Sequence, residues 1–322
     1  MKRKTSYIIV VSIFLSAVVT SCKKEKDEEK VMTMTTSVSG DVKILLAGTG
    51  SVTIDWGDGS AKDTKELANV NTEFIHNYSV SNTRTIRIYG DNITGLNCRN
   101  NQLTSLDVSN NTALKNINCV LNQLTSLDVS KNIALTELDC VTNPLTSLDV
   151  SNNTLLKELY CNNNSFTNLD VSKNTALTDL NCSLNQLTNL DVSKNIALTN
   201  LSCSRNQLAN LDVNKNIDLE YLLCSNNIIT DLDVSKNTLL KQLECDNNQL
   251  MNLDMSNNAK LIRLNCAFNI ISDTKLNILF GTLHSSTGVI KTIYIRDNPG
   301  THTCNPSIAI EKGWVVDVYF PY

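Results

Sequence analysis

The residues best suited to chemistry in this sequence are its cysteines and a row of evenly spaced aspartates. Nine of the eleven cysteines lie 21 residues apart, at positions 98, 119, 140, 161, 182, 203, 224, 245 and 266. Zinc ligands must converge within a short stretch of chain, as in a CxxC pair, and the sequence contains no such pair. The spacing therefore indicates a stacked repeat rather than a metal centre or an enzyme active site.

The aspartates follow the same period, at positions 107, 128, 149, 170, 191, 212, 233 and 254. They alternate with leucine and valine, so we expect a solvated charged row in which lysines such as Lys131 and Lys173 relieve the repulsion. A cation-binding stripe is the alternative. Glycoside hydrolysis needs two carboxylates in a cleft with different pKa values, which a flat row of identical side chains does not supply.

Other reactive groups are scattered. The histidines His76, His284 and His302 lie far apart, and no nucleophile elbow, phosphate loop or paired metal-binding histidine occurs. With 28 basic and 32 acidic residues, the chain lacks the positive charge that nucleic-acid binding requires. Aromatic residues make up 5% of the chain, few for a surface that stacks on bases or sugars. We expect no enzymatic activity, no cofactor and no nucleic-acid partner.

The first 22 residues are typical of a secretion signal. Basic residues at Lys2–Lys4 precede an apolar run from Tyr7 to Val19, which is too short to span a bilayer. The run ends in Val19-Thr20-Ser21-Cys22, which resembles the lipobox of bacterial lipoproteins. This resemblance implies a signal peptide over residues 1–21 and lipid attachment at Cys22, which would anchor the protein in a membrane. An ordinary secretory signal that contains a cysteine is the alternative.

Residues 22–30 carry the charged sequence KKEKDEEK after Cys22 and cannot bury a core, so we expect a solvated tether. The segment resembles the tags that follow the lipid cysteine in surface-exposed lipoproteins of Bacteroidetes-type bacteria. The resemblance implies an outer-membrane lipoprotein of the cell envelope that faces the exterior. A plain spacer in a periplasm-facing protein is the alternative.

Aligned on the cysteines, each repeat reads LxxLxCxxNxLxxLDVSxNxx. The unit resembles the leucine-rich repeat family, whose strand signature is LxxLxLxxNxL, with cysteine in place of the third leucine. The resemblance implies a solenoid over residues 96–271. Apolar and polar residues alternate in both halves of the unit, which predicts an all-β dominated fold with two short parallel strands in each 21-residue coil.

Two columns of asparagine accompany the repeat. One follows each cysteine by three residues, from Asn101 to Asn269, and the other follows the valines, from Asn111 to Asn258. Asparagine tolerates left-handed backbone, and its amide pairs with otherwise unsatisfied backbone groups, so we expect both columns to close the corners of the coil. The cysteines are expected to be reduced, buried thiols.

The segment before the repeats, residues 31–95, has a different character. Its stretch Asp55-Trp56-Gly57-Asp58-Gly59, followed by His76-Asn77-Tyr78 and Thr85-Ile86-Arg87-Ile88, resembles a PKD-like domain. The resemblance implies a small β-sandwich of the kind that serves as a spacer or adhesive module. A calcium site at Asp55 and Asp58 is an open alternative.

The repeat is interrupted after Cys266. Ser272 or Asp273 is expected to cap a helix whose apolar face comprises Leu276, Leu279, Phe280 and Leu283. The segment from Ile290 to Ile295 restores the strand signature with isoleucine in the cysteine position. Residues 272–322 are thus predicted to form an α/β cap with one helix and a final repeat-like strand, in which Cys304 is buried.

The outward positions near the cysteines are the best candidates for a binding surface. Most are small polar residues, and the apolar or aromatic exceptions are Val120, Leu121, Val141, Tyr160, Leu184, Tyr221 and Leu223. Such side chains on one face are typical of interface hot spots. We predict a monomeric, non-catalytic envelope protein that binds a protein or glycan through this face. The alternatives are a structural or adhesive spacer without a ligand, and a glycan-binding accessory of a polysaccharide-utilisation system.

Overall fold

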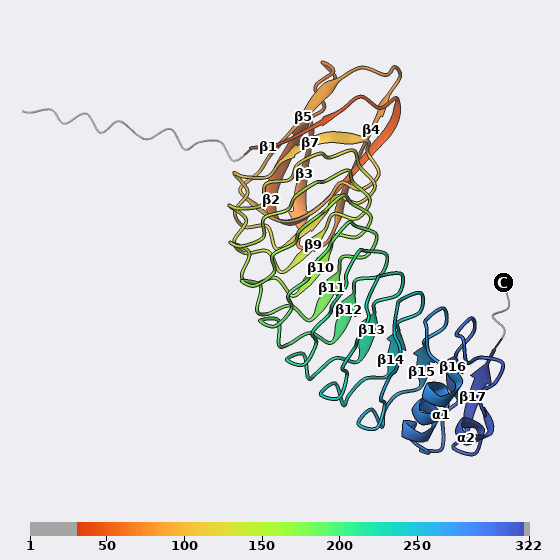
Figure 1. Cartoon of the computed structure of the whole chain (residues 1–322). Helices are drawn as coiled ribbons and strands as arrows, with labels where there is room; N and C mark the ends of the chain where they lie inside the picture. Colours follow the sequence, from red (N-terminus) through yellow and green to blue (C-terminus); the bar gives the residue numbers. More distant parts are fainter. Residues whose placement is uncertain (1–30, 319–322) are drawn as a thin grey trace, which may run out of the picture.

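The computed structural model describes residues 31–318. The predicted signal peptide at 1–21, the lipid attachment at Cys22 and the tether at 22–30 lie outside the described residues. Over the described range the chain forms an elongated, curved solenoid, with a β-rich segment at its N-terminal end and two short helices at its C-terminal end (Figure 1).

Each repeat contributes one short strand directly before its cysteine. These strands are β8 (Asn116–Asn118), β9 (Glu137–Asp139), β10 (Glu158–Tyr160), β11 (Asp179–Asn181), β12 (Asn200–Ser202), β13 (Tyr221–Leu223), β14 (Gln242–Glu244) and β15 (Arg263–Asn265). They pair in parallel, so that Leu159 lies opposite Leu138 on one side and Leu180 on the other. Because every coil has the same length, equivalent residues stack on one another and form columns along the solenoid.

The nine repeat cysteines form one of the buried columns, and all are free thiols. Burial raises their pKa values, for example to about 12 for Cys98 and Cys182. They are therefore neutral, apolar core residues that pack with the leucines and valines of the same coils. Their predicted burial is confirmed.

The second arc of each coil differs from its prediction. This valine arc spans residues 166–174 in one coil and the equivalent residues in the others, and it contains no repeated strand within residues 31–318. One backbone bond joins neighbouring arcs, from Gln186 N to Phe166 O at 2.9 Å. Soon afterwards the carboxylate of Asp170 accepts the N–H of Ser172 at 2.8 Å, which turns the chain. The side chain thus captures a backbone group that a second ladder would need.

The asparagines of the first column pair with the backbone as predicted. Asn185 donates from Nδ2 to the carbonyl oxygens of Cys182 and Cys161, at 3.0 and 3.1 Å, and its Oδ1 accepts the N–H of Phe166 at 3.0 Å. The expectation of left-handed backbone at these asparagines is wrong. The residue before each one takes that conformation instead, as in Leu184 with a φ of 55°.

The N-terminal segment consists of β1 (Val31–Thr36), β2 (Gly40–Asp55), β3 (Asp63–Ala68), β4 (Thr72–Tyr78), β5 (Arg84–Tyr89), β6 (Asn92–Asn97) and β7 (Leu103–Asp107). The long strand β2 pairs with β4 and β6 through its first half and with β3 and β5 through its second. The two halves meet at Gly48, whose φ is 148° and where a Cβ would lie 2.1 Å from the carbonyl oxygen of Asn92. Only glycine fits this close approach.

The same segment closes the N-terminal end of the solenoid. Strand β6 pairs antiparallel with β2 and parallel with β8, so it is also the strand of the first coil. On the other side of the coil, β1 pairs with β7 in the first valine arc. The boundary predicted between residues 95 and 96 falls inside β6, in a sheet that is continuous across it, and the division into domains stays a prediction.

The C-terminal cap contains α1 (Asp273–Thr282), β16 (Lys291–Tyr294), α2 (Ser307–Ile310) and β17 (Trp314–Asp317). Helix α1 begins as predicted, with the Ser272 hydroxyl accepting the N–H of Lys275 at 3.4 Å, and its predicted apolar face is buried. Ile295 occupies the cysteine position and is buried. Cys304 is half-buried rather than buried, because it lies in the turn that leads to α2 at the surface.

Candidate functional site

The outward face of the cysteine-bearing strands is called the strand face below. It comprises the residues three and one before each cysteine and the two that follow it. The column three before contains Asn116, Glu137, Glu158, Asp179, Asn200, Tyr221, Gln242 and Arg263, and the column one before contains Asn118, Asp139, Tyr160, Asn181, Ser202, Leu223, Glu244 and Asn265. Neighbours within a column are about 4.8 Å apart.

The seven predicted binding residues lie on the strand face but in separate places. Tyr160 is in the column one before cysteine on β10, whereas Tyr221 is in the other column on β13, with β11 and β12 between them. Leu223 shares β13 with Tyr221 and is half-buried. Val120 and Val141 directly follow their cysteines in neighbouring coils and are also half-buried. The two tyrosines therefore do not form one patch.

Leu121 and Leu184 sit second after their cysteines, where the backbone is left-handed, with φ of 56° and 55°. Their side chains are 45% and 42% exposed. Left-handed backbone costs a non-glycine residue about 1–2 kcal/mol, and asparagine, which fills the same position at 163 and 226, tolerates it best. Both leucines thus combine backbone strain with apolar exposure.

Tyr160 is surrounded by negative charge. Its hydroxyl donates to Glu158 Oε2 at 3.1 Å. Burial, together with the charges of Asp179, Glu158 and Glu137, raises the pKa of Tyr160 well above its ordinary value. No cation lies over its ring among the residues from 31 to 318.

Sequence reasoning missed the four carboxylates of this region. Glu137, Asp139, Glu158 and Asp179, called the acidic segment below, lie on the consecutive strands β9, β10 and β11. Partial burial raises the pKa of Asp139 and of Asp179. The available signal was the residue type at positions three and one before each cysteine, which differs from coil to coil while the core positions repeat.

The acidic segment forms hydrogen bonds with uncharged neighbours. Asn116 Nδ2 donates to Glu137 Oε2 at 2.6 Å, and Asn118 Nδ2 donates to Asp139 Oδ2 at 3.1 Å. Asn200 Nδ2 donates to Asp179 Oδ2. None of the four carboxylates forms an ion pair within the described part of the chain.

At the C-terminal end of the strand face, two carboxylates form ion pairs with cations of the same chain. Arg263 Nε pairs with Glu244 Oε1, and its guanidinium lies 4.5 Å from the centre of the Tyr294 ring. Lys241 pairs with Glu220 at 2.6 Å and lies 5.9 Å from the centre of the Tyr221 ring. Carboxylates and aromatic rings therefore occur at both ends of the strand face, and cations pair with them at the C-terminal end.

A pocket of about 370 Å³ lies where the N-terminal segment meets the solenoid. Its lining comes from β2, the β3–β4 connection, β6, β8 and β9, and comprises Ala47, Asn69, Asn71, Thr94, Gly95, Leu96, Asn97, Asn116, Ile117, Asn118 and Glu137. Glu137 belongs both to this pocket and to the acidic segment, so the two are continuous.

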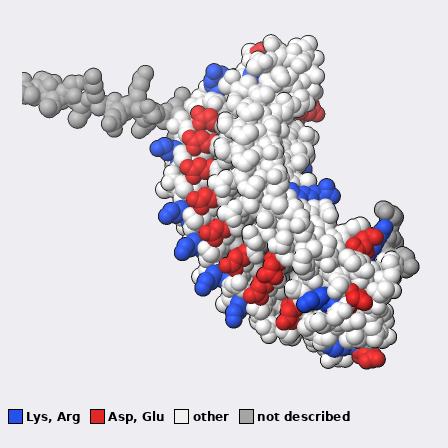
Figure 2. All heavy atoms as spheres, viewed as in Figure 1, with Lys and Arg blue, Asp and Glu red and all other residues white. Residues whose placement is uncertain are grey.

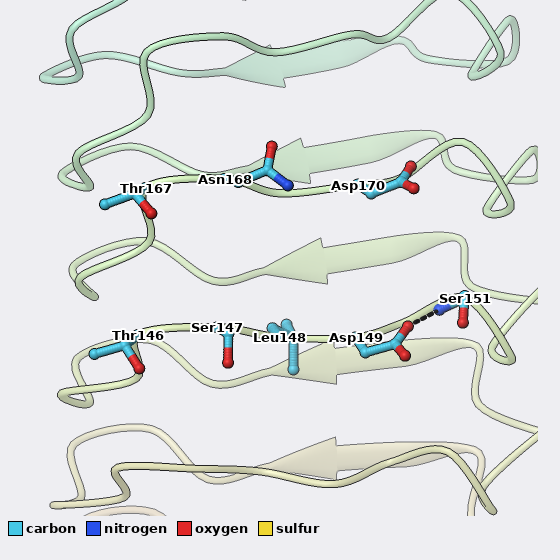
Figure 3. A pocket seen from close by; sticks show the side chains of 8 residues that line it. All are labelled: Thr146, Ser147, Leu148, Asp149, Ser151, Thr167, Asn168 and Asp170. Carbon is cyan, nitrogen blue, oxygen red and sulfur yellow. Dashed lines mark hydrogen bonds between the residues drawn. The ribbon is translucent and has the colours of Figure 1, made fainter.

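The valine arcs present a different surface. Figure 2 shows their acidic row with lysine side chains beside it, along the outer edge of the bend. A pocket of about 350 Å³ between two neighbouring arcs is lined by Thr146, Ser147, Leu148, Asp149, Ser151, Thr167, Asn168 and Asp170 (Figure 3). Asp149 accepts the N–H of Ser151 at 2.9 Å, and hydrogen bonds from Ser151 lower the pKa of Asp149. Asp149 Oδ1 is thus already hydrogen-bonded within the turn.

Asp55 and Asp58, the possible calcium ligands at the N-terminal end, already pair with other side chains. Asp55 pairs with Lys62 at 3.1 Å, and Asp58 Oδ2 lies 2.7 Å from His76 Nε2. Across residues 31–318 no group of three or more His, Cys, Asp or Glu side chains is placed to hold a metal ion. In the same range, neither helix has the length and apolar character needed to cross a membrane.

No family model matches this sequence, and no curated protein matches it either. Solved structures do. The functional domain of InlJ from Listeria monocytogenes, which includes a cysteine ladder, is 36% identical to this chain and superposes with a TM-score of 0.61. The match covers 72% of this chain, which spans half the length of the InlJ structure.

A second solved structure shows the same fold. It is a leucine-rich repeat protein from Leptospira interrogans, with a TM-score of 0.53 and 20% identity. This match covers 65% of the present chain and 62% of the Leptospira chain. Both structures agree with the architecture predicted from the period of 21 residues.

Proposed function

We propose that this leucine-rich repeat solenoid is a non-catalytic protein-binding module and that its strand face holds the partner. Solenoids present long surfaces on which many side chains meet a partner without a catalytic cleft. The strand face has this form, with exposed Leu121, Leu184 and Tyr221 set among polar side chains.

The observation that carries the proposal is the variation of the strand face between coils. The column three before cysteine contains Asn, Glu, Asp, Tyr, Gln and Arg, although the backbone register is the same in every coil. On the valine arc, the outward aspartate recurs in all eight repeats from Asp107 to Asp254. A surface that serves only the fold can repeat itself, whereas a surface that fits an irregular partner cannot.

A spacer without a ligand is the second candidate, and a glycan-binding accessory is the third. The spacer does not account for strained leucines at positions where asparagine fits. A glycan-binding role would be located in the PKD-like segment, where Trp56 is buried and its ring stacks on His76 at 5.0 Å. That ring is not available to stack on a sugar, which counts against a glycan site at Trp56.

The envelope location belongs to the same proposal. The lipobox-like sequence ending at Cys22 and the charged segment after it support an outer-membrane lipoprotein that faces the exterior. The substitution Cys22→Ala should abolish labelling by a radioactive fatty acid, because Cys22 is the only acceptor that the motif provides. Persistent labelling of the variant would contradict the lipid anchor without affecting the binding proposal.

The binding proposal is tested with paired variants of the full chain. Envelope and host-surface proteins captured by the unmodified protein are identified, and their affinities are measured again with the double variant Tyr160→Ala, Tyr221→Ala. Loss of an aromatic side chain that anchors the contact should weaken binding about thirtyfold or more. The matched control is Asp149→Asn with Asp191→Asn on the valine arc, which should leave the affinity unchanged.

Thermal unfolding of both variants provides the folding control, since neither change alters the core. Partners that respond to the aspartate control but not to the tyrosine variant would move the site to the valine arc. A panel of glycans that binds the unmodified chain more tightly than any captured protein would favour the glycan-binding alternative.

A further inference from the structure

Both ends of the strand face carry carboxylates and aromatic rings, but cations of the same chain pair with these groups at the C-terminal end. At the C-terminal end, Lys241, Arg263 and Arg296 lie over the rings of Tyr221, Tyr294 and Phe268, at 5.9, 4.5 and 5.5 Å. The first two cations also pair with Glu220 and Glu244. This end therefore shows what the face attracts, namely ammonium and guanidinium groups held between a carboxylate and an aromatic ring.

The acidic segment has the ring and the carboxylates but no such cation. Tyr160 lies among Glu137, Glu158 and Asp179, all of which act on its hydroxyl. Arg99 acts on Asp139 from a distance without forming an ion pair, and the exposed Lys115 and Lys157 at the entry to β8 and β10 form none with these carboxylates. The negative charge of this part of the face is thus left for an external cation.

Apolar side chains adjoin the acidic segment on its other side. Val120 and Val141 occupy neighbouring coils directly after their cysteines, and Leu121 beside them is 45% exposed. From β8 to β11 the face spans about 14 Å, which four or five residues of extended chain would cover. The pocket lined by Glu137 and five asparagines, three of them in β6 and β8, extends it toward the N-terminal segment.

We propose that the strand face over β8 to β11 docks a basic polypeptide segment of the partner protein, with lysine or arginine side chains at the acidic segment and apolar side chains on Val120, Leu121 and Val141. This inference rests on the proposed function and specifies its partner. An anionic lipid surface or a nucleic acid would be repelled by the four carboxylates. A neutral saccharide would gain little from the charges and finds only one ring, that of Tyr160.

The test uses a fluorescently labelled synthetic peptide in which lysine and arginine alternate with leucine and glycine, titrated with the full chain. Two control peptides replace the cations by glutamine or the leucines by serine. The strand-face variant carries Glu137→Gln, Asp139→Asn, Glu158→Gln and Asp179→Asn. The matched variant carries Asp128→Asn, Asp149→Asn, Asp170→Asn and Asp191→Asn on the valine arc, and it removes the same number of charges.

We expect the strand-face variant to weaken binding of the basic peptide about thirtyfold or more. The valine-arc variant should change the affinity by about twofold or less, because its charges are screened at that distance. The glutamine peptide should bind weakly to every form, and the serine peptide should lose about tenfold. Far-UV circular dichroism and thermal unfolding confirm that the variants, whose substitutions keep side-chain size, are folded.

Equal weakening by the two variants would overturn the inference, because net charge alone would then explain the binding. Tight binding of the glutamine peptide, or of a neutral oligosaccharide in its place, would overturn it as well. If no basic peptide binds while captured partners still depend on Tyr160 and Tyr221, the partner chemistry is wrong and the proposed function stands. If the captured partners also bind the strand-face variants as tightly as the unmodified chain, the inference and the proposed function are both wrong.

Discussion

Both arcs of each coil expose aspartates to solvent, but the surroundings of these aspartates differ between the two arcs. Asp191 on the valine arc and Asp179 on the strand face belong to one repeat. Hydrogen bonds from Ser193 lower the pKa of Asp191, whereas partial burial raises the pKa of Asp179. One carboxylate stabilises the turn that follows it, and the other is held on the surface at a cost to the fold.

The difference distinguishes polar side chains that stabilise the fold from polar side chains that remain available to a partner. The aspartates of the valine arc accept backbone N–H groups and recur in every coil, as Asp170 and Asp191 do. The polar groups of the strand face vary between coils and bond chiefly to side chains of neighbouring coils, although Asp139 Oδ1 also accepts the N–H of Val141 at 3.4 Å. In a repeat protein, such a contrast within one chain indicates which surface is under a demand other than folding.

The largest expected effect concerns the asparagines of the two arcs. Asn185 near the strand pairs through both amide groups, whereas Asn195 on the valine arc donates to Val171 O and Asn174 O at 2.9 Å, and its Oδ1 has no partner within the described residues. Asn185→Ala should therefore lower the free energy of unfolding by about 2–3 kcal/mol, and Asn195→Ala by about 1 kcal/mol less. Urea unfolding followed by circular dichroism measures both. Equal losses would show that the unpaired oxygens are bridged by water.

The next effect isolates the strain on the strand face. Leu184 has a φ of 55°, and Asn163 and Asn226 occupy the same position in other coils. Leu184→Asn should raise the free energy of unfolding by about 1 kcal/mol, because asparagine tolerates this backbone better. Thermal unfolding at matched protein concentration measures it. A loss of stability would mean that the Leu184 side chain makes stabilising contacts, and its backbone strain would then not support a binding role.

The smallest expected effect is the opposite influence of Asp179 and Asp191 on the pH dependence of stability. The raised pKa of Asp179 means that its contribution to stability is favourable below the unfolded value and is lost as pH rises through the folded value. The lowered pKa of Asp191 gives a contribution that is present above the unfolded value and is lost as pH falls through the folded value. At pH 7, Asp179→Asn should therefore raise the unfolding temperature slightly and Asp191→Asn should lower it slightly.

The two shifts should converge toward zero in acid, where both aspartates are protonated. Unfolding temperatures recorded from neutral pH down to well below the ordinary pKa of aspartate give the comparison. Shifts of the same sign at neutral pH would show that the two carboxylates affect stability in the same direction, contrary to this prediction.

Much of the fold was predictable because it depends on period and composition. Nine cysteines at one spacing fix the coil length, and Ser272 before an apolar periodic segment gives the start of α1. The site was predictable only in part. Tyr160 and Tyr221 were correctly assigned to the same sheet, but the carboxylates at Glu137, Asp139, Glu158 and Asp179 read as ordinary polar residues, since no single one departs from what a surface position tolerates.

The sequence by itself determined the solenoid, its parallel register and its buried thiols. A constant coil length leaves one way to stack like residues, and alternation decides which residues are inside. Tertiary structure alone decided that the valine arc forms turns and that the left-handed residue precedes each asparagine of the first column. It also decided that cations pair with carboxylates at one end of the strand face and leave the other end acidic. These outcomes depend on which side chains from different coils reach each other and on how far each is buried, and both are set by the stacking of residues 21 or more apart in the chain.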